Sequence, residues 1–437
     1  MTSNKTTLTY TASVPVLDSC DVLVIGGGSA GSSAAVAAAG TGAKVILVER
    51  YGFLGGTGAM VLDTFYGFFT PQVERKVVGG IPDRVIDGLK ARNVLIKRPN
   101  TYGAGAGYTY DPESLKAVWD ELVQDAGVHL LLHSYFVDAL TDGARVTGAL
   151  IGTKQGLKAI YAKTIVDASG DADVVARAGG PFEDAGAMGT AQSLTTTFKM
   201  INVNVDAAKA FPKKEMWQKM ADASASGDYN LPRKEGSSHI TPHEGVMVTN
   251  MTRVAGVDPT DPAALASAEQ EGRKQAFEYA RFLRDQVPGY ERSTLGGLSI
   301  QIGVRESRRV RGDYWLTRED VLAARKFDDA IAQCGAPIEE HHAGGDTRWE
   351  YLPAGETYDI PFRCLVPQDL TSIVVAGRCL SASHDAHASV RSIGQCLAMG
   401  QAAGLAAALS SQHNYADVRD LDTGMLRSQL KDLGAVL

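Results

Sequence analysis

The chain has 437 residues, of which 44 % are hydrophobic, and a formal net charge of −7. This length predicts roughly two or three domains, the negative charge argues against binding to nucleic acid, and no apolar run approaches the roughly 20 residues that cross a bilayer. The first residues also lack the apolar centre of a signal peptide. We therefore expect a cytoplasmic enzyme that contacts neither nucleic acid nor a membrane.

The first predicted elements form a strand, a turn and a helix near the N-terminus. The apolar run Val22–Ile25 predicts a buried strand, an alanine-rich helix follows, and Val45–Val48 predicts a second buried strand. Three glycines lie between the first strand and the helix. Gly26 permits a tight turn, Gly28 lets the backbone approach a pyrophosphate, and Gly31 lets the helix lie close to the strand.

An acidic residue completes this pattern. Glu49 directly follows the second strand, where it can accept hydrogen bonds from a ribose 2′-hydroxyl and would repel a 2′-phosphate. The unpaired N–H groups and the partial positive charge at the start of the helix attract phosphate groups. Strand, glycine turn, helix, strand and acid together are the fingerprint of a dinucleotide-binding site.

Further elements follow in the middle of the chain. Asp111-Pro112 predicts the start of a helix, with Asp as the N-cap and Pro at the first helical position. Val128–Leu140 predicts a strand, and Arg145–Ile151 with Leu157–Asp167 predicts a hairpin. After a region of short apolar runs and polar loops, Pro262–Gln286 predicts one long amphipathic helix.

The pattern of the N-terminal unit returns near the C-terminus. Ile373–Ala376 predicts another buried strand, and a helix rich in small residues is expected at about Gln395–Leu409. Gly377 and Gly394 lie between them and permit close approach of the backbone to another group.

The cysteines and histidines do not have the spacing of a metal or redox centre. None of the five cysteines lies in a CxxC pair, so neither an iron–sulfur cluster nor a dithiol centre is predicted. The odd number also argues against a disulfide framework. His341 and His342 follow Glu339 and Glu340, but adjacent residues rarely aim at one ion, and we expect no metal site.

Four separated segments carry a family resemblance: Glu49–Thr57, Ile165–Asp171, Gly303–Thr317 and Ala376–Ala408. The second reads IVDASGD and is similar to a "DATGD" segment, with Ser169 where threonine is usual. Together with the fingerprint, they resemble the FAD-dependent oxidoreductases of the glutathione reductase/fumarate reductase-like group. The resemblance implies that the cofactor is FAD.

The same resemblance implies an α/β fold with a discontinuous, Rossmann-like FAD-binding domain and a mixed α+β substrate/cap domain. The expected FAD-binding domain combines residues 15–60, 111–185 and 364–412. Residues 61–110 and 186–363 are expected to form the cap, and residues 413–437 a C-terminal extension.

The motifs also predict the cofactor-binding residues. A helix N-terminus near Gln395 that points at the flavin ring would stabilise the negative charge that develops there on reduction, and Arg378 or Arg391 could add to that effect. The full predicted set is Gly26, Gly28, Ser29, Ala30, Gly31, Glu49, Arg50, Gly55, Gly56, Thr57, Phe136, Ala168, Ser169, Gly170, Asp171, Gly377, Arg378, Ser389, Arg391, Gly394 and Gln395.

Two histidines are candidate catalytic residues. His384 and His387 flank Asp385 in the C-terminal segment. A histidine near its ordinary pKa of about 6.5 is suited to move a proton beside hydride transfer. The alternative is that both histidines are structural residues held by hydrogen bonds.

An arginine-rich run is the candidate substrate-binding segment. If it is extended, Arg305, Arg309 and Arg311 share one face of the strand. A planar guanidinium suits a carboxylate, and Arg305 with Arg363 could bind one, so Arg305 is assigned to the catalytic site. The alternative is a surface strand covered with salt bridges.

These observations predict a two-electron oxidation of a small organic substrate, which could carry a carboxylate, or the reverse reduction. Oxygen or another acceptor would reoxidise the flavin. Reduced nicotinamide is not expected as the donor, because Gly103–Gly107 lacks the strand, helix and acid of a second fingerprint. A flavin-dependent monooxygenase and a flavin-bearing electron-transfer or scaffold subunit are the alternatives. The substrate, a homo-oligomeric state and covalent attachment of FAD stay open.

Overall fold

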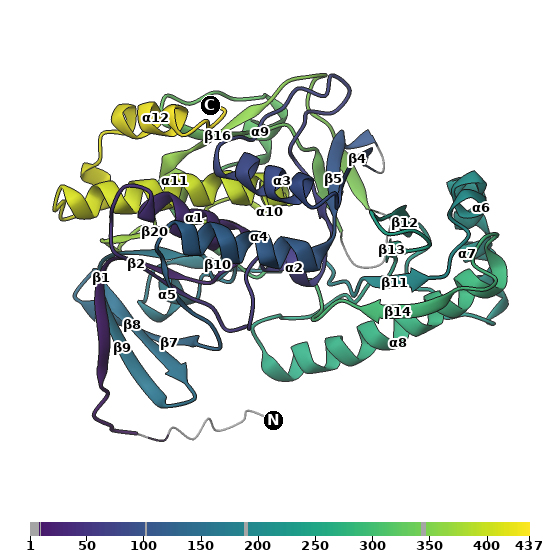
Figure 1. Ribbon diagram of the computed structural model, residues 1–437, viewed down its shortest axis with the longest axis horizontal. Helices are drawn as coiled ribbons and strands as arrows, with labels where there is room; N and C mark the ends of the chain where they lie inside the picture. Colours follow the sequence, from purple (N-terminus) through teal and green to yellow (C-terminus); the bar gives the residue numbers. More distant parts are fainter. Residues whose placement is uncertain (1–7, 9, 101–102, 188–190, 342–346) are drawn as a thin grey trace.

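A seven-stranded sheet forms the centre of the protein (Figure 1). The computed structural model describes residues 8, 10–100, 103–187, 191–341 and 347–437. Five strands of the sheet run parallel, in the order β6-β2-β1-β9-β20. Their bounds are β1 Val16–Ile25, β2 Val45–Val48, β6 His129–Leu131, β9 Gly156–Asp167 and β20 Ile373–Val375. Both predicted strands of the fingerprint and the predicted C-terminal strand are thus confirmed.

The long strand β9 joins this parallel sheet to an antiparallel extension. Strands β7 (Tyr135–Asp142) and β8 (Arg145–Thr153) continue the sheet from β9, and the predicted hairpin of β8 with β9 is confirmed. The single strand predicted at Val128–Leu140 is wrong: it is divided into β6 and β7. The break falls at His133, whose φ of 52° is incompatible with an extended strand.

Helices α1 (Ser29–Ala39) and α11 (Ile393–Gln412) pack against each other beside the sheet (Figure 1). Their contact is very close because it is made by small residues. A Cβ on Gly404 would lie 2.0 Å from the carbonyl oxygen of Ala34, and one on Gly400 would lie 2.1 Å from that of Ala30. The predicted C-terminal helix is therefore confirmed, and it begins two residues earlier than expected.

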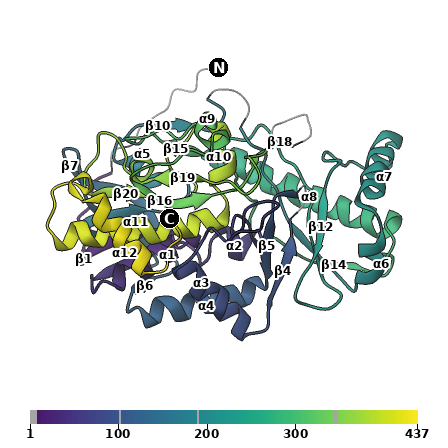
Figure 2. The same cartoon turned by 90° about the horizontal axis from the view of Figure 1, so that it is seen from above.

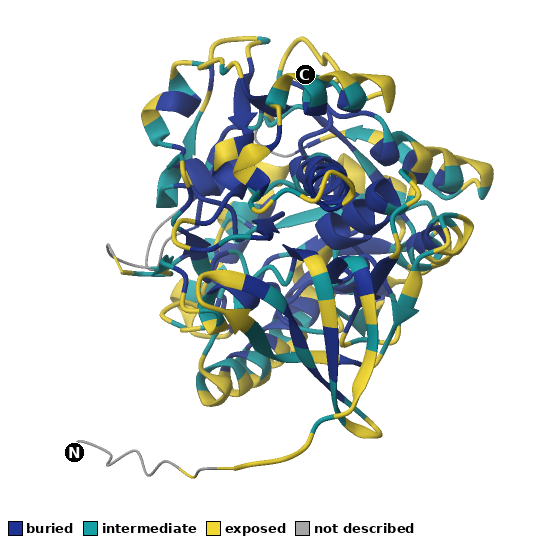
Figure 3. Ribbon diagram, turned by 90° about the vertical axis from the view of Figure 1, so that its left-hand side faces the viewer, coloured by how far each residue is buried: buried dark blue, intermediate teal, exposed yellow. Residues whose placement is uncertain are grey.

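Helix α11 is also the one described helix that is long and apolar enough to cross a bilayer. From the sequence we expected no segment long and apolar enough to cross a bilayer, and this expectation is corrected for α11. Of its most apolar window, 94 % is buried inside the protein. Figure 3 shows the same distribution: buried residues gather at the centre, and exposed residues follow the N-terminal segment and the outer ends of the strands.

A second layer of short elements covers the other side of α1. The predicted helix after Asp111 is confirmed as α4, and the Asp111 side chain accepts a hydrogen bond from the backbone N–H of Ser114 at 2.8 Å. This layer consists of α2 Thr57–Met60, β3 Thr64–Phe65, α3 Ile81–Ala91, β4 Leu95–Pro99, β5 Ala106–Tyr110 and α4 Pro112–Asp125.

A separate group of elements lies at one end of the molecule (Figure 2). The predicted long helix is confirmed as α8 (Pro262–Gln286), and it packs on a four-stranded antiparallel sheet. This group has its own core, which includes Phe198, Tyr279 and Phe282. The other members are β11 Phe198–Ile201, α6 Val205–Ala210, α7 Lys213–Ser226, β12 Ser237–Ile240, β13 Met247–Asn250 and β14 Thr294–Leu298.

The remaining strands and helices of the described chain are mostly short. They are α5 Asp173–Arg177, β10 Phe182–Asp184, β15 Arg308–Val310, α9 Arg318–Leu322, β16 Ala330–Cys334, β17 Ile338–Glu340, β18 Arg348–Glu350, β19 Tyr358–Pro361, α10 His384–Val390 and α12 Thr423–Asp432. The main core takes side chains from both predicted domains. The exact division into domains stays a prediction.

The contact between α1 and α11 yields a stability prediction. Gly404→Ala should lower the free energy of unfolding by about 1–3 kcal/mol, because the added methyl group meets a backbone oxygen that cannot move alone. The midpoint of urea unfolding measures this effect. Gly297→Ala is the matched control, since a Cβ there meets no atom within 4 Å. Equal midpoints for the two variants would contradict the proposed close packing.

Candidate functional site

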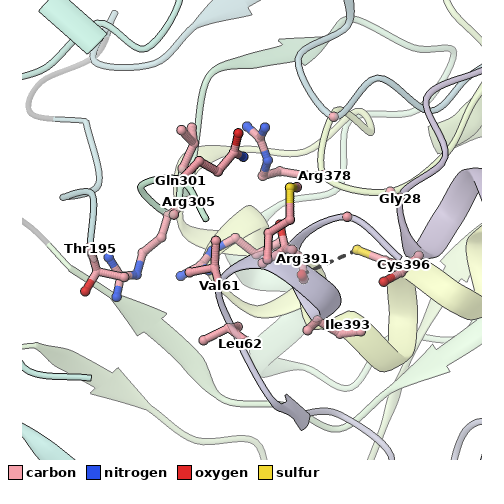
Figure 4. Close-up of a pocket in the computed structure, with 18 of the residues that line it drawn as sticks. Gly28, Val61, Leu62, Thr195, Gln301, Arg305, Arg378, Arg391, Ile393 and Cys396 are labelled. Atoms are coloured by element: carbon pink, nitrogen blue, oxygen red, sulfur yellow. Dashed lines mark hydrogen bonds between the residues drawn. The ribbon is translucent and has the colours of Figure 1, made fainter. Parts of the chain in front are cut away.

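A cavity of about 320 Å³ extends from the glycine turn of the fingerprint to strand β17 (Figure 4). In the close-up, Gly28 and Cys396 lie on one side, and Arg305 and Thr195 on the other. Of the predicted site residues, it is lined by Gly26, Gly28, Ser29, Ala30, Glu49, Arg50, Gly56, Thr57, Ala168, Ser169, Gly170, Asp171, Arg305, Gly377, Arg378 and Arg391. The fold thus brings four distant segments to one cavity.

The glycines of the turn have the geometries that the fingerprint requires. Gly26 has a φ of +97°, which favours glycine. A Cβ on Gly31 would lie 1.7 Å from the carbonyl oxygen of Gly26, so helix and strand could not pack as they do. At Gly28, in contrast, a Cβ would meet only the Cα of Gly56 at 3.8 Å. Its open side faces the cavity, which leaves room for a ligand against the backbone.

The start of α1 offers an anion-binding position at the same place. The helix begins after Gly28 without a side-chain cap, and Ser29 and Ala30 line the cavity. The first N–H groups of a helix have no partner within it, and its dipole favours negative charge there. A phosphate group therefore fits this end of the cavity.

Glu49 is held rigidly beside the turn. Its carboxylate accepts hydrogen bonds from the backbone N–H groups of Gly27 at 2.6 Å and Tyr51 at 2.8 Å. The side chain is buried, and burial raises its pKa above the ordinary value. Because Glu49 also lines the cavity, its oxygens remain positioned for a ribose hydroxyl.

An ion pair joins the second and fourth motifs across the cavity wall. Arg378 binds Asp171 at 2.6 Å and donates a hydrogen bond to the hydroxyl of Ser307 at 2.7 Å. Burial alone would raise the pKa of Asp171, but the charge of Arg378 and the hydrogen bond from Ser307 lower it overall. Asp171 therefore stays ionised and fixes the guanidinium of Arg378.

The start of α11 also reaches the cavity, through Arg391, Ser392 and Ile393. Two predicted neighbours do not, and their assignment as cofactor-binding residues stays a prediction. The N–H of Gly394 donates to the carbonyl of Tyr66 at 2.9 Å, and a Cβ there would meet that same oxygen. Gln395 is fully buried and donates to the carbonyl of Gly67 at 2.9 Å. Both hold a loop against the helix.

Four further predicted cofactor residues lie outside the cavity lining. Gly31 serves helix packing, and Gly55 donates its N–H to the carbonyl of Gly27 at 2.9 Å. Phe136 lies in β7 and packs against the main core. Ser389 is fully buried and donates to the carbonyl of Ala336 at 2.6 Å. Each has a packing or hydrogen-bonding role within the fold.

Neither candidate catalytic histidine lines the cavity, and their catalytic role stays a prediction. His387 is fully buried and its Nε2 contacts the carbonyl of Arg378 at 2.8 Å. Burial lowers its pKa to about 3. The Nδ1 of His384 lies 2.9 Å from Glu306, a buried carboxylate, and its Nε2 lies 3.5 Å from Glu340. These contacts favour the alternative that both histidines are structural residues held by hydrogen bonds.

The structure places the predicted arginines in different surroundings. Arg309 and Arg311 do share a face, but both bind Glu183, and neither lines the cavity. Arg363 likewise binds Asp329 at 2.9 Å. Their charges are thus compensated within the protein. Only Arg305 of this group lines the cavity.

Arg305 is joined there by Arg233 and Arg391. Within the part of the chain that the structure describes, none of the three has a carboxylate within 4.0 Å. Their hydrogen bonds go to neutral oxygens: Ser193 for Arg305, Asn250 for Arg233 at 3.2 Å, and the side chain of Gln192 for Arg391 at 2.9 Å.

The arginines repel one another in a cavity that excludes much of the solvent. Burial, followed by the charges of Arg391 and Arg233, lowers the pKa of Arg305 well below its usual range. A guanidinium nevertheless keeps its proton in proteins. This end of the cavity therefore carries positive charge that an anionic ligand would stabilise.

The sequence reasoning did not identify Glu339 and His341 as site residues. Both line the cavity, and the Nε2 of His341 lies 3.0 Å from Glu339. Arg233 was also missed, since it stands alone in a polar loop without any motif. Among the residues with described placement, no cluster of three potential metal ligands occurs. His342 lies outside the described residues.

The comparisons with known proteins agree with this arrangement. A sequence model of the FAD dependent oxidoreductase family matches residues 21–430, and the chain therefore belongs to that family. Its cofactor is accordingly FAD, and the open glycine turn with its uncapped helix fits the pyrophosphate of such a dinucleotide.

Individual relatives are more distant. A fumarate reductase (cytochrome) from Shewanella frigidimarina is 36 % identical over 70 residues, which are 16 % of this chain and 12 % of that relative. A geranylgeranyl bacteriochlorophyll reductase-like structure from Thermoplasma acidophilum is 14 % identical, with a TM-score of 0.46 over 95 % of this chain and 83 % of the other. The flavin-dependent brominase Bmp2 is 13 % identical, with a TM-score of 0.46 and the same shares covered.

The position of Glu49 yields a prediction on cofactor binding. Glu49→Ala should weaken FAD binding by about 1–3 kcal/mol, because hydrogen bonds to a charged group are lost. Titration of the FAD-free protein with FAD, followed by flavin fluorescence, gives the dissociation constant. Glu113→Ala, at an exposed position on α4, is the control. An unchanged constant in Glu49→Ala would remove Glu49 from the cofactor site.

Proposed function

We propose that this member of the FAD-dependent oxidoreductase family catalyses two-electron oxidation of a small, carboxylate-bearing substrate, or the reverse reduction. The observation that carries the proposal is the charge of the cavity. One end holds the glycine turn and Glu49, and the other holds three arginines whose described partners are neutral.

The charge argument favours an anion at the arginine end. Arg233, Arg305 and Arg391 face the cavity, and none of them forms an ion pair with the carboxylates of Glu269 and Glu339, which also line it. Buried charges without a partner are costly, and guanidinium groups bind carboxylates with paired hydrogen bonds. A carboxylate-bearing substrate would supply the missing negative charge, whereas a neutral substrate would leave it uncompensated.

Bound FAD supplies the two-electron chemistry at its N5 atom. The chain supplies the arrangement around it. Arg305 and Arg233 bind the carboxylate and orient the carbon that reacts. Arg391 and the start of α11 favour negative charge on the adjoining ring. Glu339 and His341 are the groups at this end of the cavity that can bind or release a proton.

An anaerobic screen tests the proposal directly. The purified flavoprotein is mixed with 2-hydroxy acids, amino acids, dicarboxylic acids and, for comparison, the matching neutral alcohols and amines. We expect the flavin absorbance to bleach with at least one carboxylate and more slowly with its neutral counterpart. Faster bleaching by neutral compounds would contradict the carboxylate assignment, and bleaching only with a protein partner would favour an electron-transfer subunit.

Arg305→Ala should raise the apparent KM for the carboxylate substrate about tenfold or more, since a charged hydrogen bond is lost. Bound FAD should remain at its wild-type level. Arg311→Ala is the matched control, because Arg311 binds Glu183 and does not line the cavity. If both variants keep the wild-type KM, Arg305 does not contact the substrate.

Reduced nicotinamide should not act as the electron donor. The chain contains one dinucleotide fingerprint, and the family's FAD occupies it. In anaerobic stopped-flow mixing without substrate, NADH and NADPH at micromolar concentration should leave the flavin oxidised, while dithionite should reduce it. Rapid bleaching by either nicotinamide would instead support the monooxygenase alternative.

A further inference from the structure

A continuous series of hydrogen bonds leads away from the arginine end of the cavity. The Nε2 of His341 lies 3.0 Å from Oε1 of Glu339, and its Nδ1 lies 3.1 Å from Oγ1 of Thr347. The Thr347 hydroxyl in turn donates to Oε1 of Glu235 at 2.6 Å. Four side chains thus form an unbroken path from the cavity to Glu235.

The two ends of this path differ in their surroundings. The side chain of Glu339 is 39 % exposed and lines the cavity, whereas that of His341 is only 4 % exposed. At the far end, Glu235 is 15 % exposed and pairs with Arg253 at 3.4 Å. The imidazole is therefore enclosed between one carboxylate that lines the cavity and another that is partly exposed outside the cavity lining.

The donors along the path can be assigned by counting protons. The hydroxyl of Thr347 has a single proton, which it gives to Glu235. The contact between Thr347 and His341 must then use the Nδ1 proton of the imidazole. At rest, the contact between Nε2 and Glu339 then brings two acceptors together at 3.0 Å, and a proton that enters between them is bound by both groups.

We propose that Glu339, His341, Thr347 and Glu235 form a proton relay that connects the substrate cavity with the surface. This inference rests on the proposed function, since oxidation of the substrate releases a proton along with the hydride. The proton enters the gap between Glu339 and His341. It binds Nε2, the Nδ1 proton moves to Thr347, and the Thr347 proton moves to Glu235.

The net result is the transfer of one proton from Glu339 to Glu235. The number of O–H and N–H bonds that form equals the number that break. Loss of the proton from Glu235 to water and return of the imidazole to its Nδ1-protonated tautomer restore the starting arrangement. Reduction of a substrate uses the same path in reverse. His341 and Glu339 exchange the proton, and Thr347 acts as a positioning residue that links them to Glu235.

The surroundings of His341 and Glu339 prevent these two groups from retaining a transferred proton. Burial and the charge of Arg305 lower the pKa of His341 well below its ordinary value. Burial would raise the pKa of Glu339, but the neighbouring imidazole of His341 and the charges of Arg391 and Arg305 lower it to about 2. Neither group holds an additional proton firmly, which favours transfer onward to Glu235.

The first test needs no substrate. In the FAD-bound protein with ¹⁵N-labelled histidine, NMR at neutral pH should show His341 protonated at Nδ1, with the signal assigned by its loss in His341→Gln. Thr347→Val removes the acceptor and should move His341 to the Nε2-protonated form, whereas Thr347→Ser should keep the wild-type signal. An unprotonated Nδ1 in the wild type, or no change in Thr347→Val, would overturn the relay.

The second test uses the carboxylate that bleaches the flavin fastest in the screen. Thr347→Val should slow bleaching at saturating substrate by about 100-fold, with an increased solvent deuterium isotope effect and an unchanged KM. Thr347→Ser should remain near the wild-type rate. Equal rates in the two variants would overturn the relay. If no carboxylate bleaches the flavin, the proposed substrate class fails, and the NMR result still decides whether the hydrogen-bonded path exists.

Discussion

The close packing of helix α1 between the strand end and helix α11 determines the rest of this structure. This packing depends on glycines, which have no side chain to separate the backbones. Gly31 lies against the backbone of Gly26, and Gly400 and Gly404 lie against the backbone of α1. A single methyl group at any of these positions would push the elements apart. The contact fixes the start of α1 and the start of α11 at the walls of one cavity.

Charge balance then separates structural arginines from those that face a ligand. Arg309 lies within 3.2 Å of the buried Glu306 and also binds Glu183. Outside the cavity, such pairs offset the cost of removing a guanidinium from water. Arg233, Arg305 and Arg391 show the opposite pattern, because their described partners are neutral oxygens. The difference indicates which positive charges are left for a bound anion.

The cap group of β11–β14 and α8 completes the cavity. It has its own core of aromatic and methionine side chains, so it forms a wall that does not depend on the central sheet. From this group come Arg233 and Asn250, while Glu339 lies in strand β17 and His341 directly after it. The groups with substrate and proton chemistry therefore lie opposite the dinucleotide turn.

The sequence by itself determined the dinucleotide unit, the long helix α8 and the C-terminal strand and helix. These elements were predictable because local periodicity, caps and turn glycines report on neighbouring residues. It also pointed to Glu49 and the turn residues of the fingerprint as cavity residues. These residues belong to one short strand–turn–helix–strand unit, so their order along the chain predicts that they lie close together in the fold.

Only the tertiary structure decided which polar side chains share the cavity. His384 and His387 had the chemistry of catalytic residues but are bound to other parts of the protein, while His341 and Arg233 had no distinguishing motif. Their proximity arises from contacts between segments more than one hundred residues apart, such as the hydrogen bond between Thr347 and Glu235. Hydrogen bonding and burial are properties of that arrangement, and a linear pattern cannot contain them.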